Sequence, residues 1–215
     1  MTGNIRHAKR SFVMSIWAIV PVKPFREAKS RLASVLSSDE RAALRRAFLV
    51  RTLQLLSQVR EIKRTLVVSR DTAALQVARK HGAHTVTESG TPQLNPALAR
   101  ASDVCVSFGA DAVLILPSDL PLLTPADVLS LINASGEPEC VSIAPDRRDD
   151  GTNALYMRPP RLIPYTFGPQ SFTRHLTLAR EREVCVEVCR SSGLSLDVDV
   201  PEDLELYQLH SRIVK

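Results

Sequence analysis

The chain has 215 residues, of which 44% are hydrophobic and 24% are charged. This length favours one large domain with its own core, and the composition excludes disorder of the whole chain. No run approaches the roughly 20 apolar residues that cross a bilayer. The balance of 28 Lys and Arg against 23 Asp and Glu suits a partner that carries phosphates. Aromatic residues make up only 5%, and the basic residues are scattered, so no nucleic-acid surface is expected.

The cysteines and the first residues bear on location and on domain boundaries. None of the four cysteines forms a C-x-x-C pair, which argues against a zinc site and indicates reduced thiols in a cytoplasmic protein. Cys185 and Cys189 lie in an alternating run that places both thiols on one face of a strand. Residues 1–13 are polar and basic and contain no secretory segment. We expect them to form a flexible extension before a single domain at 14–215, with Met14 as an alternative start.

After this leader, apolar runs alternate with helical patterns. Strands are predicted over 15–22, 65–69, 84–87, 111–117, 141–144 and 154–157, with a last short strand at 195–200. Helices are predicted over 38–59, 71–81 and 95–108, then from Thr124, from Ser171 and from Pro201. Ser38 and Thr124 are the expected N-caps, and Gly82 and Gly109 are stop signals. Apolar strands that alternate with helices predict a mostly parallel α/β sheet with helices on both faces.

In such sheets, ligands bind beyond the carboxyl ends of the strands, so the residues there deserve the closest inspection. The loop after the first strand contains no glycine, but it carries Lys23, Lys29 and Arg31. These cations could neutralise a polyphosphate in place of a glycine-rich backbone cradle, or they could be solvated loop charges.

Carboxylates follow two further predicted strands. Asp119 comes directly after the strongest apolar run, and Asp197 and Asp199 alternate with Val198 near the C-terminus. Mg²⁺ that holds phosphates uses one or two carboxylates together with phosphate oxygens. Asp119 and Asp199 would supply such a pair, although each residue could instead cap a turn or helix.

Two glycine-containing turns offer hydroxyl and amide groups. One is Gly151-Thr152-Asn153 before a strand, and the other leads through Gly168 to Ser171 at a helix N-terminus. Free amides and the helix dipole favour an anion there, and an ordinary capped helix is the alternative. Arg174 and His175 on the first turn of this helix are placed to reach such an anion.

Five segments occur together in order: VPVKPFREAKSRLA, PSDLPLL, DGTNAL, FGPQSFTRH and LDVDVPEDL. Together they resemble the 2-phospho-L-lactate guanylyltransferase family (CofC/FbiD type) of coenzyme F-420 biosynthesis, from about Ser15 to Leu209. The resemblance implies a Rossmann-like, GT-A-like nucleotidyltransferase fold with a mixed, mostly parallel sheet. It implies transfer of GMP from GTP to 2-phospho-L-lactate, phosphoenolpyruvate or 3-phospho-D-glycerate, with release of pyrophosphate. It also allows a homodimer.

The resemblance also implies roles for residues of this chain. Asp119 and Asp199 would be catalytic and would hold Mg²⁺, and Thr152, Gly168 and Ser171 would hold the phospho-acid. Lys23, Lys29 and Arg31 would contact the triphosphate, with Lys29 also catalytic. The segment from Glu88 to Asn95, followed by the helix that carries Leu98, would lie near the guanine and ribose, so Asn95 is assigned to GTP.

This chemistry is consistent with the residues present. The nucleophile would be a phosphate oxygen, already ionised at neutral pH, so no general base is required. Three other functions remain open. One is another nucleotidyltransferase, with a molybdopterin or sugar-phosphate acceptor, although the glycine-rich first loop typical of those enzymes is absent. The second is a non-catalytic nucleotide-binding module, against which the paired aspartates argue. The third is a glycosyltransferase, which would normally carry D-x-D where Ser118-Asp119-Leu120 has one carboxylate.

Overall fold

A computed structural model describes residues 14–26, 30–90 and 92–213. The extension expected over residues 1–13 lies outside this part of the chain. The sheet of the described domain consists of β1 (Ile16–Pro21), β2 (Ile62–Ser69), β3 (His84–Thr87), β4 (Ala112–Ile115), β5 (Cys140–Pro145), β6 (Thr152–Arg158) and β7 (Cys185–Val188). The helices are η1 (Ser30–Leu32), α1 (Ser38–Gln58), α2 (Thr72–Lys80), α3 (Leu94–Ser107), α4 (Pro125–Ile132), α5 (Ser171–Glu181), α6 (Ser192–Ser195) and α7 (Pro201–Ile213).

The seven strands form one mixed sheet in the order β3-β2-β1-β4-β6-β5-β7. The pairs of β1 with β2 and β4, of β2 with β3 and of β5 with β7 are parallel. Only β6 runs antiparallel to its neighbours β4 and β5. The first residue of β6, Thr152, therefore lies at the same edge as the last residue of β5, Pro145. The predicted mostly parallel α/β sheet is confirmed.

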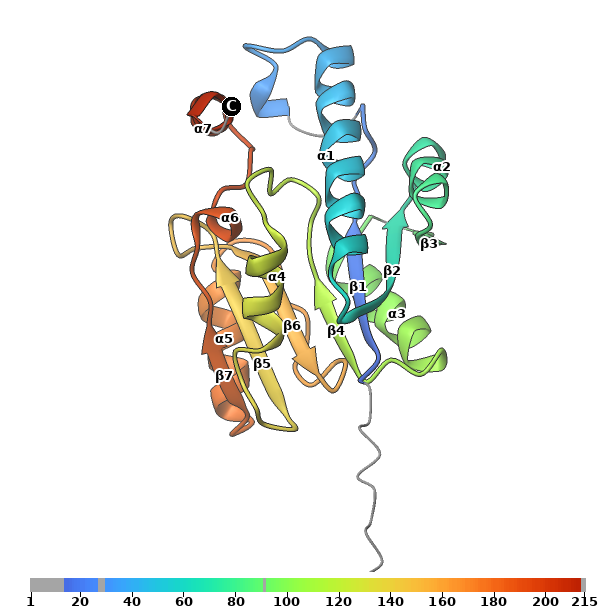
Figure 1. Ribbon diagram of the computed structural model, residues 1–215, viewed down its shortest axis with the longest axis vertical. Helices are drawn as coiled ribbons and strands as arrows, with labels where there is room; N and C mark the ends of the chain where they lie inside the picture. The colour runs from blue at the N-terminus through green and yellow to red at the C-terminus, as the bar shows by residue number, and fades with distance from the viewer. Residues whose placement is uncertain (1–13, 27–29, 91, 214–215) are drawn as a thin grey trace, which may run out of the picture.

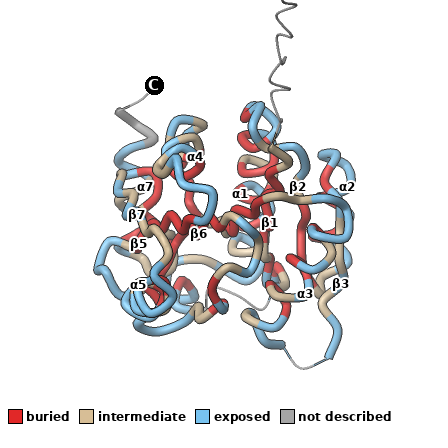
Figure 2. Tube along the Cα trace, turned by 90° about the horizontal axis from the view of Figure 1, so that it is seen from below, coloured by how far each residue is buried: buried red, intermediate tan, exposed pale blue. Residues whose placement is uncertain are grey.

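Helices cover both faces of the sheet because successive strand side chains point to opposite sides. In β1, Ile16, Ala18 and Val20 belong to one buried cluster, and Trp17 and Ile19 belong to the other. Helices α1, α2 and α4 contribute to the first cluster, while α3 and α5 contribute to the second. Figure 2 shows the resulting pattern, with buried strands inside and exposed outer helix surfaces. No helix of the described residues is long and apolar enough to cross a membrane.

Local sequence signals fix most helix ends. Thr124 caps α4 with Pro125 in its first turn and Asp127 closing a capping box, as predicted. Helix α1 is capped by Ser37 rather than Ser38, because Glu40 completes a capping box with Ser37. Gly82 and Gly109 follow α2 and α3 with positive φ angles, which matches the predicted stops.

The strand predicted over 195–200 is wrong. Residues 192–195 form the short helix α6, and the segment up to Val200 has no regular structure. Val198 is nevertheless fully buried in a small third cluster with Leu32, Phe48 and Leu204. The alternation of apolar and acidic residues in this segment therefore reflects the burial of Leu196 and Val198 and not a sheet strand. Cys185 and Cys189 both pack against the first of the two large clusters, as their spacing predicts, and all four cysteines are free thiols.

Candidate active site

A cleft of about 700 Å³ opens beyond the carboxyl ends of β1 and β4. These neighbouring strands lie where the strand order changes direction, which is the usual ligand position in a sheet of this kind. Figure 1 shows η1, α6 and α7 at the same end of the molecule. The cleft is lined by seven of the residues that the sequence analysis assigned to the site: Lys23, Arg31, Asp119, Thr152, Gly168, Ser171 and Asp199.

The loop after β1 is held by Arg45, a buried residue of α1 that the sequence analysis did not select. Its guanidinium donates to the carbonyl oxygens of Lys23 at 3.0 Å and Pro24 at 3.3 Å. Burial lowers the pKa of Arg45, and the charges of Asp119 and Asp199 oppose that shift. Arg45 also lines the cleft, so it adds positive charge there and fixes the backbone that carries Lys23. Only its position within an amphipathic helix could have indicated it, and that pattern does not separate a functional residue from a surface one.

Backbone contacts bring the two predicted metal ligands together. Val198 donates its N–H to the carbonyl oxygen of Asp119 at 3.2 Å, so the segment with Asp199 lies against the loop after β4. Asp197 also lines the cleft. Burial and the neighbouring charges of Asp119 and Asp199 raise its pKa to about 6. Three carboxylates thus share this part of the cleft. Only two of them, Asp119 and Asp199, were predicted from the sequence as metal ligands.

Asp203 holds the backbone of this acidic segment. It sits in the first turn of α7, where its carboxylate accepts the N–H groups of Asp199 and Val200, each at 3.1 Å. Arg147 donates to its other oxygen at 2.8 Å. Asn153 adds a second anchor, since its amide donates to the carbonyl oxygens of Leu194 and Ser195 just before the segment. The side chains of Asp203 and Asn153 are both buried. They hold the backbone that carries Asp199 and are not themselves among the residues assigned as ligands.

Hydroxyl groups also line the cleft, at Thr152 and Ser171. Thr152 donates its N–H to the hydroxyl oxygen of Ser171 at 2.8 Å, which joins the start of β6 to the start of α5. The Thr152 hydroxyl lies 2.9 Å from Nδ1 of His175. His175 is fully buried and does not reach the cleft itself, in contrast to the expectation from its place on the first turn of α5. Gly168 has a φ angle of +123°, a conformation that side chains disfavour, so glycine is required at this turn.

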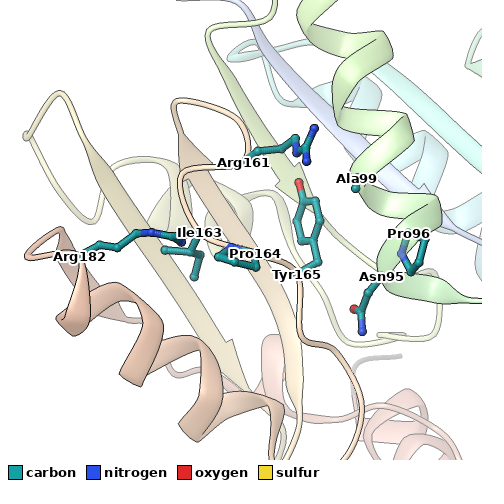
Figure 3. Close-up of a pocket in the computed structure, with 8 residues that line it drawn as sticks. All are labelled: Asn95, Pro96, Ala99, Arg161, Ile163, Pro164, Tyr165 and Arg182. Atoms are coloured by element: carbon teal, nitrogen blue, oxygen red, sulfur yellow. The ribbon is translucent and has the colours of Figure 1, made fainter.

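Asn95 stands apart from this arrangement. Asn95 begins α3, where its side-chain amide donates to the carbonyl oxygen of Phe167 and accepts the Phe167 N–H. It lines a separate cavity of about 410 Å³ between α3 and the segment that carries Tyr165 (Figure 3). Asn95 thus braces the loop that leads to Gly168, and its assignment to GTP rests on the family resemblance alone. Lys29 lies outside the described residues.

Charged and polar side chains of Arg70, Glu88 and Gln93 form the end of the cleft beyond β2. Arg70 donates to the Gly90 carbonyl oxygen at 2.9 Å and lies 3.8 Å from the Glu88 carboxylate. Glu88 also accepts the N–H of Gln93 at 3.2 Å. This region corresponds to the segment that the resemblance assigned to the guanine and ribose.

Two comparisons by sequence identify the relatives of this chain. Residues 16–213 match the family model described as guanylyl transferase CofC like. The phosphoenolpyruvate guanylyltransferase of Rubrobacter xylanophilus is 46% identical over 191 residues, which cover 89% of this chain and 92% of the relative. The 2-phospho-L-lactate guanylyltransferase of Methanothermobacter thermautotrophicus is 41% identical over 197 residues, which cover 92% and 86%.

Solved structures agree on the fold. A nucleotide-diphospho-sugar transferase from Desulfovibrio desulfuricans, itself assigned only provisionally, has a TM-score of 0.73 at 20% identity, covering 90% of this chain and 86% of its own. A nucleotidyl transferase from Methanothermobacter has a TM-score of 0.66 at 16% identity, covering 93% and 99%. At these identities the structures establish the GT-A-like nucleotidyltransferase fold, while the sequence match covers nearly the whole described domain. The chain therefore belongs to the CofC-like guanylyl transferase family.

Proposed function

We propose that this enzyme transfers GMP from GTP to a phosphorylated three-carbon acid and releases pyrophosphate, as a step of coenzyme F-420 biosynthesis. One observation carries the proposal: a single cleft joins the cations after β1, the carboxylates Asp119 and Asp199, and the Thr152 and Ser171 hydroxyls. Two anions must meet for such a reaction, and this cleft offers a separate set of partners to each. Phosphoenolpyruvate is the first acceptor to test, because a relative named for it is 46% identical.

The reaction needs no group that removes a proton from the acceptor. An ionised phosphate oxygen of the acid attacks the α-phosphorus of GTP and forms the new P–O bond. The bond between the α-phosphorus and the oxygen that bridges to the β-phosphorus breaks, and its electrons leave with pyrophosphate. Lys23 and Arg31 would bind the triphosphate, and Lys29 is proposed to join them. Their positive charges reduce the repulsion between the two anions and stabilise the leaving group.

The donor set of the cleft fits a magnesium ion. Among the described residues no group of three or more His, Cys, Asp or Glu side chains forms a complete metal cage. Mg²⁺ seldom requires one, since it takes few carboxylates and completes its shell with phosphate oxygens and water. Asp119 and Asp199 would hold the ion, which when bound supplies positive charge to the phosphates. Burial is the main cause that raises the pKa of Asp197, and the negative charges of Asp119 and Asp199 beside it add to the shift.

The two substrates would take opposite ends of the cleft. The carboxylate of Glu88 is an acceptor, as the N–H groups on the Watson–Crick edge of guanine require, so we place the base beside Arg70 and Glu88. We place the phospho-acid at Thr152, Gly168 and Ser171. Free thiols are consistent with the cytoplasmic location that we propose for the enzyme.

Pyrophosphate release tests this function directly. The protein is incubated with GTP and Mg²⁺ and with each of the three phospho-acids in turn, and ATP and CTP replace GTP as controls. Release that requires GTP and one acid would support the proposal and name the acceptor. Absence of release with every acid would contradict it and point to another acceptor class, such as a sugar phosphate.

Two variants test the metal ligands. Asp119→Asn and Asp199→Asn should each lower kcat by roughly a hundredfold or more, because each removes a charge that holds the ion. Asp103→Asn is the matched control, since Asp103 is exposed on α3, pairs with Arg161 and does not line the cleft. Circular dichroism should show all three variants folded. Near-normal turnover in a folded Asp119→Asn or Asp199→Asn protein would remove the metal assignment.

A further inference from the structure

His175 makes two hydrogen bonds that together determine its protonation. The ring is fully buried behind the hydroxyl wall of the cleft, with Phe167 edge-on at 5.0 Å between ring centres. Its Nε2 lies 3.0 Å from the backbone nitrogen of Thr166, which can only donate. Nε2 must therefore be the acceptor and carry no hydrogen.

The hydrogen of the neutral ring must then be on Nδ1. Nδ1 faces the Thr152 hydroxyl at 2.9 Å, so His175 donates and the Thr152 oxygen accepts. A doubly protonated ring would point an N–H at the N–H of Thr166. Burial disfavours that form as well, since it is the main cause that lowers the pKa of His175 to about 4, and Arg174 adds to it.

This arrangement leaves the Thr152 hydroxyl able to act towards a ligand only as a hydrogen-bond donor. Its oxygen already accepts from His175, and the residue lines the cleft. No acceptor for its hydrogen is found among the described residues. The neighbouring Ser171 has the same character, because its oxygen accepts the Thr152 N–H at 2.8 Å. Two hydroxyls that can still donate form a wall suited to anionic oxygens and unsuited to donors.

We propose that His175 is a positioning residue that holds the Thr152 hydroxyl as a donor to a phosphate or carboxylate oxygen of the acceptor acid. The proposal rests on the proposed function, because it takes the acceptor to bind at Thr152. His175 touches neither substrate and acts only through Thr152. Its effect should therefore fall on the acceptor and leave GTP binding unchanged.

Two amide substitutions separate the two hydrogen bonds of the ring. His175→Asn keeps a nitrogen bonded to Cγ, where Nδ1 stands, and so keeps a donor for Thr152. His175→Gln places its amide at the position of Nε2, which keeps an acceptor for Thr166 but removes the donor for Thr152. We expect His175→Gln to raise the KM for the acceptor by roughly three- to tenfold, the effect of one hydrogen bond. The KM for GTP should stay constant, and His175→Asn should lie closer to wild type.

A double-mutant cycle with Thr152→Val distinguishes positioning from packing. Once the hydroxyl is gone, His175→Gln should cause no further rise in the KM for the acceptor. Independent effects of the two substitutions, equal rises in the KM values of both substrates, or an unchanged acceptor KM in His175→Gln would each overturn the proposal. If the wild-type protein shows no guanylyl transfer to any acid, the proposed function fails instead.

A measurement on the wild-type protein needs neither activity nor a stable variant. Nitrogen NMR of the protein labelled in its histidine rings reports which ring nitrogen carries the hydrogen. We expect His175 to show a protonated Nδ1 and a bare Nε2 near neutral pH. A ring with its hydrogen on Nε2 would overturn the proposal even where the kinetic variants do not fold.

Discussion

At the scale of single residues, burial moves the pKa values of Asp197 and His175 in opposite directions. In both cases the charged form is disfavoured, which raises the pKa of the acid Asp197 to about 6 and lowers that of the base His175 to about 4. The surroundings differ, because Asp197 lies beside the carboxylates of Asp119 and Asp199, whereas His175 lies against the hydroxyl of Thr152. One physical cause thus favours the neutral acid at Asp197 and the neutral ring of His175 behind Thr152.

The depressed pKa of His175 predicts a pH-dependent stability. An unfolded histidine titrates near 6.5, so acid protonates the unfolded chain before the folded one, and stability is lost as pH falls from about 6.5 to about 4. A shift of this size corresponds to about 3 kcal/mol of unfolding free energy. Urea unfolding of wild type and His175→Gln across this range should show the larger loss in wild type. Parallel pH profiles of the unfolding free energy would contradict a buried, neutral His175 ring. The raised pKa of Asp197 contributes in the opposite direction, but equally in both proteins.

At the scale of the secondary-structure elements, helix α1 holds two loops of the site. Arg45 binds the carbonyl oxygens of the loop after β1, while Arg51 donates to the Leu123 carbonyl oxygen at 2.9 Å in the loop after β4. Helix α7 has a similar function for the acidic segment, through the carboxylate of Asp203 in its first turn. Loops without regular structure thus receive their geometry from helix side chains, which satisfy backbone groups that no strand partner satisfies.

Asp203 offers a test of this support. In Asp203→Ala, the N–H groups of Asp199 and Val200 and the guanidinium of Arg147 lose their acceptor, which should cost about 1–3 kcal/mol of unfolding free energy. The Mg²⁺ concentration for half-maximal activity should rise as well, because Asp199 is no longer held. Glu202→Ala is the control, since that neighbour is exposed. Equal behaviour of the two variants in denaturant and in magnesium titration would show that Asp203 does not hold the segment.

For the whole molecule, the decisive feature is the strand order. β1 has β2 on one side and β4 on the other, and the loops that carry Lys23 and Asp119 follow β1 and β4 at the same edge and line the cleft. The antiparallel β6 brings Thr152 to the same edge by its first residue. Strands β1, β4 and β6, which are far apart in the chain, therefore supply one site, and the two buried clusters on either face of the sheet support them.

The domain is expected to act without the first residues. β1 begins at Ile16, and the N–H of Ser15 donates to the Asp111 carboxylate at 2.8 Å, which ties the start of the domain to the loop before β4. We expect a chain that starts at Met14 to unfold at the same denaturant concentration as the full chain and to keep its kcat. A truncated protein that aggregates or loses activity would assign residues 1–13 a role in the enzyme.

Much of this architecture can be predicted from short segments of the sequence. The apolar runs, the cap at Thr124 and the stop at Gly82 predicted the elements, because strand burial and helix termination depend on neighbouring residues. The segment at 195–200 was mistaken for a strand because alternation arises equally when an irregular segment buries Leu196 and Val198 and leaves the neighbouring carboxylates partly exposed. Asp119, Asp199, Thr152 and Ser171 could be selected because they follow or precede such elements and match the family segments.

By itself, then, the sequence determined the α/β class, the family and the residue types of the site. Only the tertiary structure decided which supporting side chains hold them: Arg45 beneath Lys23, Asp203 beneath Asp199, and His175 behind Thr152. Each of these contacts depends on the direction of a side chain across the packed interior or around a helix end. A pattern along the chain contains no such direction, since it arises only when distant segments fold against each other.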